Sequence, residues 1–464
     1  MSVNTLLSQL NETLAMDMNH GFVIVEKKDP KKKGYKTINY TEVNKLLNIY
    51  AKDKIQWKGR ETNIFRVWLE WSGRRDCNAI VMKPKNDHAD DEVNLWAGYG
   101  VEPKESGEWY LFLEFLRDVI CAGDMNSLKY LISWMADLVQ NPEEKKGTAI
   151  VLVGGQGIGK SFFAEWFGQL FGQHFMTISS SRHLVGHFNA HLADKLVVFF
   201  DEAEGIKNQT AQAFLKEAIT GPTRVVEPKG KDPFIVENCT RFIIGSNRMN
   251  GVIRASEDER RYCVLEPTDA HKNDTEYFGK IANQLKNGGL ERMMYDLKNF
   301  EISIDLRKVP QTAALFRQKL HSLSQSDKWW LSTLYDDKLD DEFNLWGEKI
   351  PSKHLAQSYM AYAGIDSQRA AEMAISKTMK KLCPNHSRIK LPKTSDPESK
   401  VWFYSIPSQR SCRSDVEKYL GHEVFKSYSD PGTPSLDKAE MVKAIARAAQ
   451  PRQLVQLQGE IQNG

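Results

Sequence analysis

Thr148-Ala-Ile-Val-Leu-Val-Gly-Gly-Gln-Gly-Ile-Gly-Lys-Ser161 joins an apolar run to a glycine-rich loop. The run predicts a buried strand over 148–153, and the residues after the loop predict a helix from about Lys160 to Phe171. The loop fits the spacing G-x-x-x-x-G-K-[ST], in which backbone N–H groups turn toward phosphate oxygens. The alternative interpretation is a glycine-rich turn that carries a Lys-Ser pair by chance.

The glycine-rich loop predicts a site for ATP and Mg²⁺. Lys160 would reach the β- and γ-phosphates, and the Ser161 hydroxyl would hold the metal ion. The residues expected to contact the nucleotide are Gly154, Gly155, Gln156, Gly157, Ile158, Gly159, Lys160 and Ser161.

Two later apolar runs end in polar residues that suit the same site. Leu196–Phe200 is followed by Asp201 and Glu202. Asp201 would help to bind Mg²⁺, and Glu202 would act as general base on the attacking water. Arg241–Ile244 leads to Asn247, which would orient that water or sense the γ-phosphate. A solvated acidic loop and an asparagine that opens a turn are the structural alternatives. Strands that alternate with helices in this way predict an α/β fold with a parallel sheet.

Basic residues near these strands suggest contacts beyond the nucleotide. Lys229 and Lys231 lie at the tip of a predicted turn, where they would contact DNA phosphates or simply face solvent on an edge hairpin. Arg260 and Arg261 precede an apolar run. In an oligomeric ATPase such an arginine can stabilise charge on a neighbour's γ-phosphate, and a surface ion pair is the alternative.

The chain as a whole is nearly neutral, since 63 Lys+Arg against 60 Asp+Glu give +3 over 464 residues. This balance excludes a histone-like polycation but not a local basic surface. The six cysteines form no C-x-x-C pair, which argues against a zinc ribbon or a disulfide framework. The sequence shows neither a secretory signal nor a run of about 18 apolar residues. We therefore expect a multidomain cytoplasmic protein with no membrane partner.

The flanking parts of the chain predict further α/β, helical and basic segments. Phe22–Val25 and the alternating apolar residues of Phe65–Trp71 predict strands, whereas apolar spacings of three and four predict helices over 108–140. Residues 352–410 predict three helices and then a strand at Val401–Ile406.

The stretch between Met373 and Ser395 is strongly basic. It contains no acid and six basic residues, which are Lys377, Lys380, Lys381, Arg388, Lys390 and Lys393. With Trp402-Phe-Tyr404 after it, this stretch resembles a winged-helix module whose basic wing would grip duplex DNA. A plain solvated face is the alternative.

Together the motifs resemble those of superfamily 3 helicases, a viral and plasmid branch of the AAA+ ATPases. The resemblance is closer still to poxvirus-type phage primase-helicases and to the helicase half of phage primase-polymerases, and it covers about residues 80 to 335. The phrases that carry it are Asn94-Leu-Trp-Ala-Gly98, Trp134-Met-Ala-Asp-Leu-Val-Gln-Asn-Pro142, Gly186-His-Phe-Asn189 and Val309-Pro-Gln-Thr-Ala-Ala314.

This resemblance implies a role for each motif. Walker A would be 154–161, Walker B would be Asp201 with Glu202, and Asn247 would end the sensor motif. A B′ region from Lys216 through Lys231 would contact DNA, with Lys216, Lys229 and Lys231 as its basic residues. Arg261 would be the arginine finger, with Arg260 second. The resemblance also implies a hexameric ring that moves 3′ to 5′ along DNA.

We therefore expect a P-loop AAA+ core between two flanking regions. The expected segments are an N-terminal α/β region at 1–105, a helical collar-like segment at 106–146, the ATPase core at 147–310, a winged-helix-like region at 311–428 and a tail at 429–464. About 150 residues precede the loop, too few for a primase domain as well as a collar. The chain would be a stand-alone helicase or a fragment of a longer protein.

The leading hypothesis is a ring-forming, ATP-dependent DNA helicase of phage or mobile-element replication. It would act on a single strand or fork in the cytoplasm of a bacterial host, with a primase or polymerase as a partner. One alternative is an ATP-switched DNA-binding initiator or loader without processive unwinding. Others are the helicase fragment of a primase-polymerase and a nucleotide-binding scaffold, although a scaffold needs no water-activating Glu202.

Overall fold

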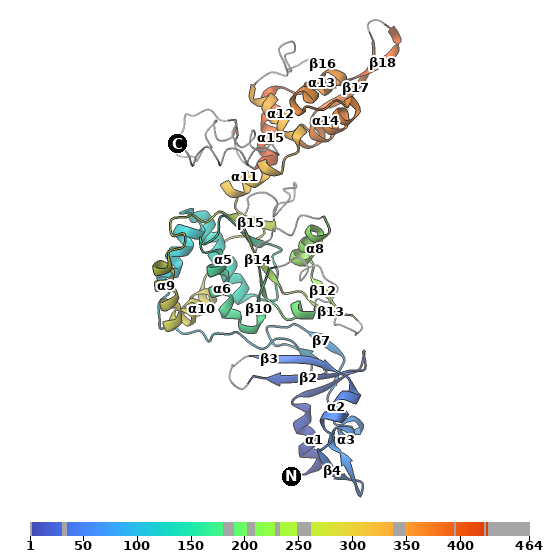
Figure 1. Ribbon diagram of the computed structural model, residues 1–464, viewed down its shortest axis with the longest axis vertical. Helices are drawn as coiled ribbons and strands as arrows, with labels where there is room; N and C mark the ends of the chain where they lie inside the picture. The colour runs from blue at the N-terminus through green and yellow to red at the C-terminus, as the bar shows by residue number, and fades with distance from the viewer. Residues whose placement is uncertain are drawn as a thin grey trace, which may run out of the picture. The chain divides into compact units, whose positions relative to one another are not determined.

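The protein divides into two compact units, as seen in a computed structural model (Figure 1). One unit comprises Met1–Val252 and Arg260–Pro310, and the other comprises Ile253–Glu259 and Gln311–Gly464. The structure describes residues 2–29, 35–179, 190–201, 209–227, 233–247, 261–336, 349–393, 396–421 and 424–425. The expected tail at 429–464 lies outside these residues.

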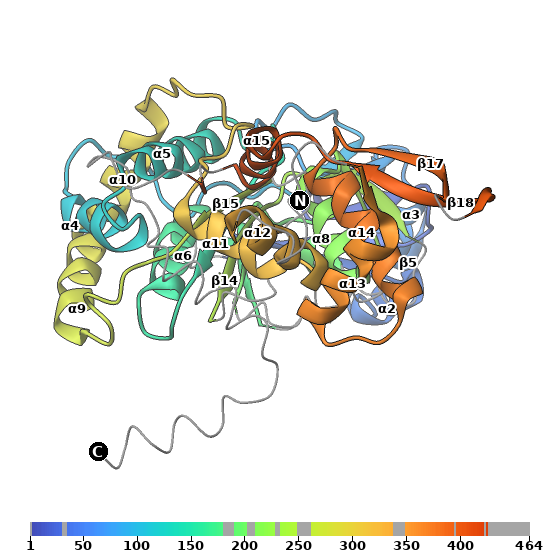
Figure 2. The same ribbon diagram turned by 90° about the horizontal axis from the view of Figure 1, so that it is seen from above.

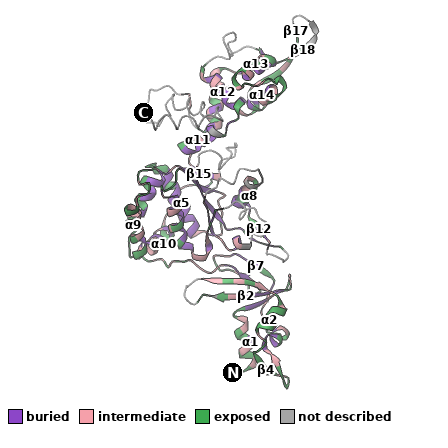
Figure 3. Ribbon diagram, viewed as in Figure 1, coloured by how far each residue is buried: buried purple, intermediate pink, exposed green. Residues whose placement is uncertain are grey.

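A five-stranded parallel sheet forms the centre of the first unit. Its order is β10 (Phe175–Ile178), β11 (Val197–Phe200), β14 (Arg241–Ser246), β9 (Ala149–Val153) and β15 (Tyr262–Leu265). All four neighbouring pairs are parallel. Every residue of β9, β11 and β14 is buried, as expected for a parallel sheet covered on both faces (Figure 3). The predicted α/β fold with a parallel sheet is confirmed.

Helices cover both faces of this sheet. Figures 1 and 2 place α5 (Met125–Gln140) and α6 (Lys160–Gly168) on one side and α8 (Gln209–Thr220) on the other. The predicted helical stretch before the sheet is α4 (Tyr110–Glu114), the π-helix η1 (Phe115–Ile120) and α5. After the sheet come α9 (Thr275–Gln284), η6 (Leu285–Gly289) and α10 (Leu290–Asn299). Helix α6 continues into the 3-10 helix η2 (Gln169–His174).

The N-terminal region contains a second sheet with apolar packing on both faces. The sheet order is β3 (Lys36–Thr41), β2 (Val23–Lys28), β1 (Leu14–Asp17) and β6 (Asp76–Cys77). Leu14, Val23 and Val25 pack with α1 (Val3–Asn11), α2 (Val43–Ile49) and α3 (Ile64–Glu70) in a small core. The alternate residues Ala15, Phe22 and Ile24 belong to the large core of the parallel sheet. Short pairs β4 (Lys54–Trp57) with β5 (Arg60–Asn63) and β7 (Ala79–Val81) with β8 (Glu92–Asn94) complete the region.

The strand predicted at Phe65–Trp71 is wrong, because these residues form helix α3. Asn63 caps this helix, since its side-chain oxygen accepts hydrogen bonds from the backbone N–H groups of Phe65 and Arg66. The buried positions 64, 65, 67 and 68 follow a helical stripe and not a two-residue period. In contrast, the strand predicted at Phe22–Val25 is confirmed by β2.

The described part of the second unit contains five helices and a three-stranded antiparallel sheet. Its elements are α11 (Ala313–Ser322), α12 (Gln325–Asp336), β16 (Lys349–Pro351), α13 (Ser352–Ala363), α14 (Gln368–Leu382), β17 (Ser387–Lys393), β18 (Asp396–Ser405) and α15 (Gln409–Leu420). The sheet order is β16-β18-β17. The predicted third helix before Val401 is wrong, because a β-hairpin follows α14 directly. Pro384 and the turn after it end the helical pattern.

Among the described residues, every helix is too short or too polar to span a bilayer. The six cysteines are buried thiols.

Candidate functional site

The glycine-rich loop leaves the carboxyl end of β9 and enters α6 at Lys160. Gly157 and Gly159 have φ values of 77° and 98°, which are left-handed conformations that favour glycine. A Cβ on Gly159 would also lie 2.8 Å from the Phe115 ring, and one on Gly157 would collide with the Asn273 side chain. The loop therefore requires glycine at both positions for conformational and packing reasons.

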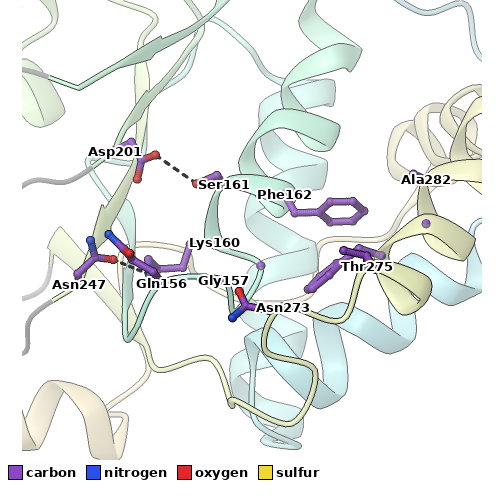
Figure 4. A pocket seen from close by; sticks show the side chains of 13 residues that line it. Gln156, Gly157, Lys160, Ser161, Phe162, Asp201, Asn247, Asn273, Thr275 and Ala282 are labelled. Carbon is purple, nitrogen blue, oxygen red and sulfur yellow. Dashed lines mark hydrogen bonds between the residues drawn. The ribbon is translucent and has the colours of Figure 1, made fainter.

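Lys160 joins the loop to the end of β14. Its ammonium group donates hydrogen bonds to the carbonyl oxygens of Gly154 at 2.7 Å and Gly155 at 2.5 Å, and to Oδ1 of Asn247 at 3.1 Å (Figure 4). The Lys160 side chain is buried, so these acceptors replace the water that the charge would otherwise keep. Strand β14 lies between β9 and β11, which brings Asn247 to the same sheet edge as the loop.

Ser161 joins the loop to the end of β11. Its hydroxyl donates a hydrogen bond of 3.2 Å to Oδ2 of Asp201, the residue directly after that strand (Figure 4). A hydroxyl and a carboxylate are hard oxygen ligands of the kind that Mg²⁺ prefers, and Mg²⁺ usually keeps several waters beside one or two carboxylates. The pair therefore fits the ion that the sequence led us to expect.

A cavity of about 650 Å³ opens at this sheet edge. Its volume is in the range of small-molecule and cofactor sites. Its lining combines five expected loop residues, Asp201 and Asn247 with a wall from α9 and the turn before it; the lining residues are Gln156, Gly157, Gly159, Lys160, Ser161, Phe162, Asp201, Asn247, Asn273, Thr275, Phe278, Gly279 and Ala282. Gly154, Gly155 and Ile158, which were also expected to contact the nucleotide, do not line it. The structure thus brings Lys160, Ser161, Asp201 and Asn247 around one cavity.

Sequence reasoning missed the wall formed by Asn273 and helix α9. Threonine, glycine and alanine on a helix carry no chemical signal of a ligand, and a phenylalanine is usually a core residue. The wall reaches the loop through a hydrogen bond of 2.9 Å from the backbone N–H of Asn273 to the carbonyl oxygen of Gly157. The local sequence signal, Asn273 followed by Asp274, indicates the start of a helix but not that the helix lines a cavity.

Other predicted residues do not lie at this cavity or lie outside the described part of the chain. Glu202, Lys229, Lys231 and Arg260 belong to the latter group. Lys216 lies on α8 and does not line the cavity. Arg261 directly precedes β15, at the amino end of a strand that runs parallel to β9. It therefore lies at the sheet edge opposite the glycine-rich loop of its own chain.

Comparisons with known proteins give three related results. Residues 152–261 match a family of unknown function, DUF5906. Over 222 residues, 45% of this chain, the sequence is 25% identical to the DNA primase-polymerase of Nitratiruptor phage NrS-1. The match covers 30% of that relative, so the chain corresponds to only part of its length.

Two solved apo structures of the NrS-1 C-terminal region share the fold. One has a TM-score of 0.62 and covers 88% of this chain and 99% of the solved chain, at 17% identity. The other has a TM-score of 0.63 and covers 87% and 98%, also at 17% identity. The chain is therefore similar in sequence and fold to the C-terminal region of a phage primase-polymerase.

Proposed function

We propose that this chain is an ATP-dependent DNA helicase of phage or mobile-element replication, with an AAA+ core of the superfamily 3 type. The observation that carries the proposal is the convergence of Lys160, Ser161, Asp201 and Asn247 on one cavity at the carboxyl edge of a parallel sheet. Ligands of open parallel sheets bind at this edge. The similarity to a phage DNA primase-polymerase supports a role in replication.

The proposed mechanism begins with an exchange of partners at Lys160. Its ammonium group turns from the carbonyls of Gly154 and Gly155 and from Asn247 to the β- and γ-phosphates of ATP. Asn247 is then released to orient the attacking water, and Glu202 takes the proton of that water. Ser161 and Asp201 would hold Mg²⁺, which polarises phosphate oxygens when bound.

The proposed assembly is a ring in which each ATP site is completed by an arginine of the neighbouring subunit. Arg261 lies at the sheet edge opposite its own glycine-rich loop, which suits a role at the site of an adjacent subunit. An arginine supplied in this way would stabilise transition-state charge on the γ-phosphate. Lys216, Lys229 and Lys231 are proposed to contact the DNA strand, so that hydrolysis moves the hairpin that carries the last two.

The test is ATP hydrolysis and strand displacement on a forked duplex with the Lys160→Ala variant. We expect wild-type protein to hydrolyse ATP and release the displaced strand, and the variant to do neither. Full ATP hydrolysis by the variant would refute the assignment of the site. ATP hydrolysis by wild-type protein without a displaced strand would refute the helicase activity and favour an initiator or loader.

One feature of the second unit favours the alternative function, a DNA-binding initiator or loader. Its elements follow the order helix, strand, helix, helix, strand, strand from α12 to β18, and the β17–β18 hairpin carries an exposed Trp402. The Arg388 guanidinium lies 4.7 Å from the centre of the Trp402 ring, and Lys390 lies 5.8 Å from it. Cations beside an exposed aromatic ring suit contacts with nucleic-acid phosphates and bases.

Arg388→Ala measures whether the hairpin binds DNA. We expect weaker duplex binding and a reduction of about one in the slope of log affinity against log salt, because one phosphate contact is lost. Met125→Ala, which removes an exposed side chain from the other unit, is the control. An unchanged affinity and slope for Arg388→Ala would exclude this hairpin from the DNA interface.

A further inference from the structure

The cavity at the glycine-rich loop has two chemically different ends. Lys160, Asp201 and Asn247 make a polar end, whereas Phe162 and helix α9 make an apolar end. Figure 4 shows the Phe162 ring pointing toward α9 and away from Asp201 and Asn247. The proposed phosphate contacts account for the polar end, but they assign no part of the ligand to the apolar end.

The apolar end is held at a fixed place relative to the loop. Asn273, with φ 58°, donates its backbone N–H to the carbonyl oxygen of Gly157 at 2.9 Å. The next residue, Asp274, caps α9 by accepting a hydrogen bond from the backbone N–H of Tyr277. The start of α9 is therefore tied to the loop that would hold the phosphates, and a ligand bound there would extend along the helix.

Two aromatic rings form part of this end. The Phe162 and Phe278 ring centres lie 4.9 Å apart at 52°, and each also packs within 6 Å of Phe115. Phe115 is fully buried, whereas Phe162 and Phe278 are half-buried. The supported rings thus present apolar surface to the cavity, which suits contact with a planar aromatic ligand.

Gly279 makes room beside these rings. It lies inside α9, where glycine costs about 1 kcal/mol relative to alanine. Its φ is not left-handed, and an added Cβ would meet no heavy atom of the described residues within 4 Å. Neither backbone conformation nor packing requires glycine at this position, but the residue lines the cavity.

We infer that the apolar end binds the base of a nucleoside triphosphate, with Phe162 and Phe278 contacting the base and Gly279 leaving space for it. This inference rests on the proposed function, because the phosphate loop determines where the rest of the ligand lies. A base joined to phosphates held at Lys160 would extend toward α9. Contact through ring faces and backbone explains why the wall is built from phenylalanine, glycine and alanine.

The test compares two ligands, ATP and inorganic tripolyphosphate, by titration calorimetry of the full chain in Mg²⁺. Gly279→Leu places a long side chain in the proposed base space and keeps a good helix former. Lys280→Leu puts the same side chain on the exposed neighbouring residue, which does not line the cavity, and is the matched control. Gly279→Ala adds only a methyl group.

We expect Gly279→Leu to lower ATP affinity by roughly tenfold or more, the range of one lost base contact, and to leave tripolyphosphate affinity unchanged. Lys280→Leu should stay within about threefold of wild type for both ligands, and Gly279→Ala should lose less ATP affinity than Gly279→Leu. Unchanged ATP binding by Gly279→Leu, or an equal loss for both ligands, would overturn the base assignment. If wild-type protein bound tripolyphosphate, and bound ATP no more tightly than tripolyphosphate, only the base assignment would fail. If it bound neither ligand, the proposed function would fail too.

Discussion

Lys160 and Asn247 are joined by a hydrogen bond of 3.1 Å from Nζ to Oδ1, although they lie 87 residues apart in the sequence. In the proposed mechanism Lys160 would contact the γ-phosphate and Asn247 would orient the water that attacks it. If the proposed roles are correct, this bond couples the sensor residue to the phosphate-binding lysine.

Changes at Asn247 should separate catalysis from binding. Asn247→Ala removes the amide that would orient water but leaves Lys160 two carbonyl acceptors, so we expect kcat for ATP to fall by about 10 to 100-fold with KM within about threefold. Asn247→Asp places a carboxylate beside the γ-phosphate and should raise KM instead. Steady-state ATPase kinetics distinguish these results, and wild-type kcat in Asn247→Ala would contradict the sensor role.

The lysines predicted to contact DNA should affect strand displacement and not ATP hydrolysis. In Lys229→Ala/Lys231→Ala we expect ATP hydrolysis to continue while strand displacement is lost, because only the proposed phosphate contacts disappear. Lys52→Ala/Lys58→Ala removes the same charge from exposed positions of the N-terminal region and serves as control. Unwinding at the wild-type rate by the first variant would refute the role of these lysines.

Breaking the buried ion pair between Arg241 and Asp137 should lower the free energy of unfolding strongly. Their atoms Nη2 and Oδ2 lie 2.7 Å apart, and both side chains are almost fully buried. Burial lowers the pKa of Arg241, with the Asp137 charge acting in the opposite direction. Arg241→Met leaves a buried carboxylate without this partner, and we expect a loss of about 3–5 kcal/mol in the free energy of unfolding.

The double variant Arg241→Met/Asp137→Leu provides the control for this prediction. It removes both charges, so we expect it to recover a large part of the stability lost in Arg241→Met. Urea unfolding measures both variants. If the double variant were as unstable as Arg241→Met, the lost hydrogen bonds from Arg241 to the carbonyls of Asn141 and Glu144 would account for the effect instead.

His174 should make the protein less stable in mild acid. Its Nδ1 donates to the carbonyl oxygen of Asp194, its Nε2 accepts from the backbone N–H of Ala97, and its ring stacks on Trp96 at 4.5 Å. Both nitrogens are thus engaged as in the neutral ring. Burial lowers the pKa of His174 from 6.5 to about 4.

Because the folded pKa is the lower one, the unfolded chain binds this proton first as the pH falls. The contribution of His174 is fully present above pH 6.5 and is lost progressively down to about pH 4, by about 3 kcal/mol in total. His174→Gln keeps one donor and one acceptor but cannot titrate. Thermal unfolding of both proteins between pH 4 and pH 7 should show a smaller loss of stability for the variant, and parallel curves would contradict this account.

The sequence was most informative where chemistry and pattern coincide. Three apolar runs predicted the parallel sheet. The residues after them, the loop from Gly154 and the polar Asp201 and Asn247, predicted the side chains that meet at its edge. The strand predicted at Phe65–Trp71 was wrong because the apolar residues of this stretch also fit a helix once Ile64 and Trp68 are counted. The wall at Phe278 could not be predicted, since it depends on a backbone hydrogen bond between Asn273 and Gly157, which are distant in the sequence.

The sheet that contains β1 and β2 links the unfolding of two apolar cores. Leu14 and Val23 pack on one face, while Ala15 and Phe22 on the other face belong to the core of the parallel sheet. Detaching this sheet would strip apolar surface from both cores at once, which favours a single cooperative unfolding unit. The amides of β1 and β2 would then exchange with solvent at the same rate as those of β9.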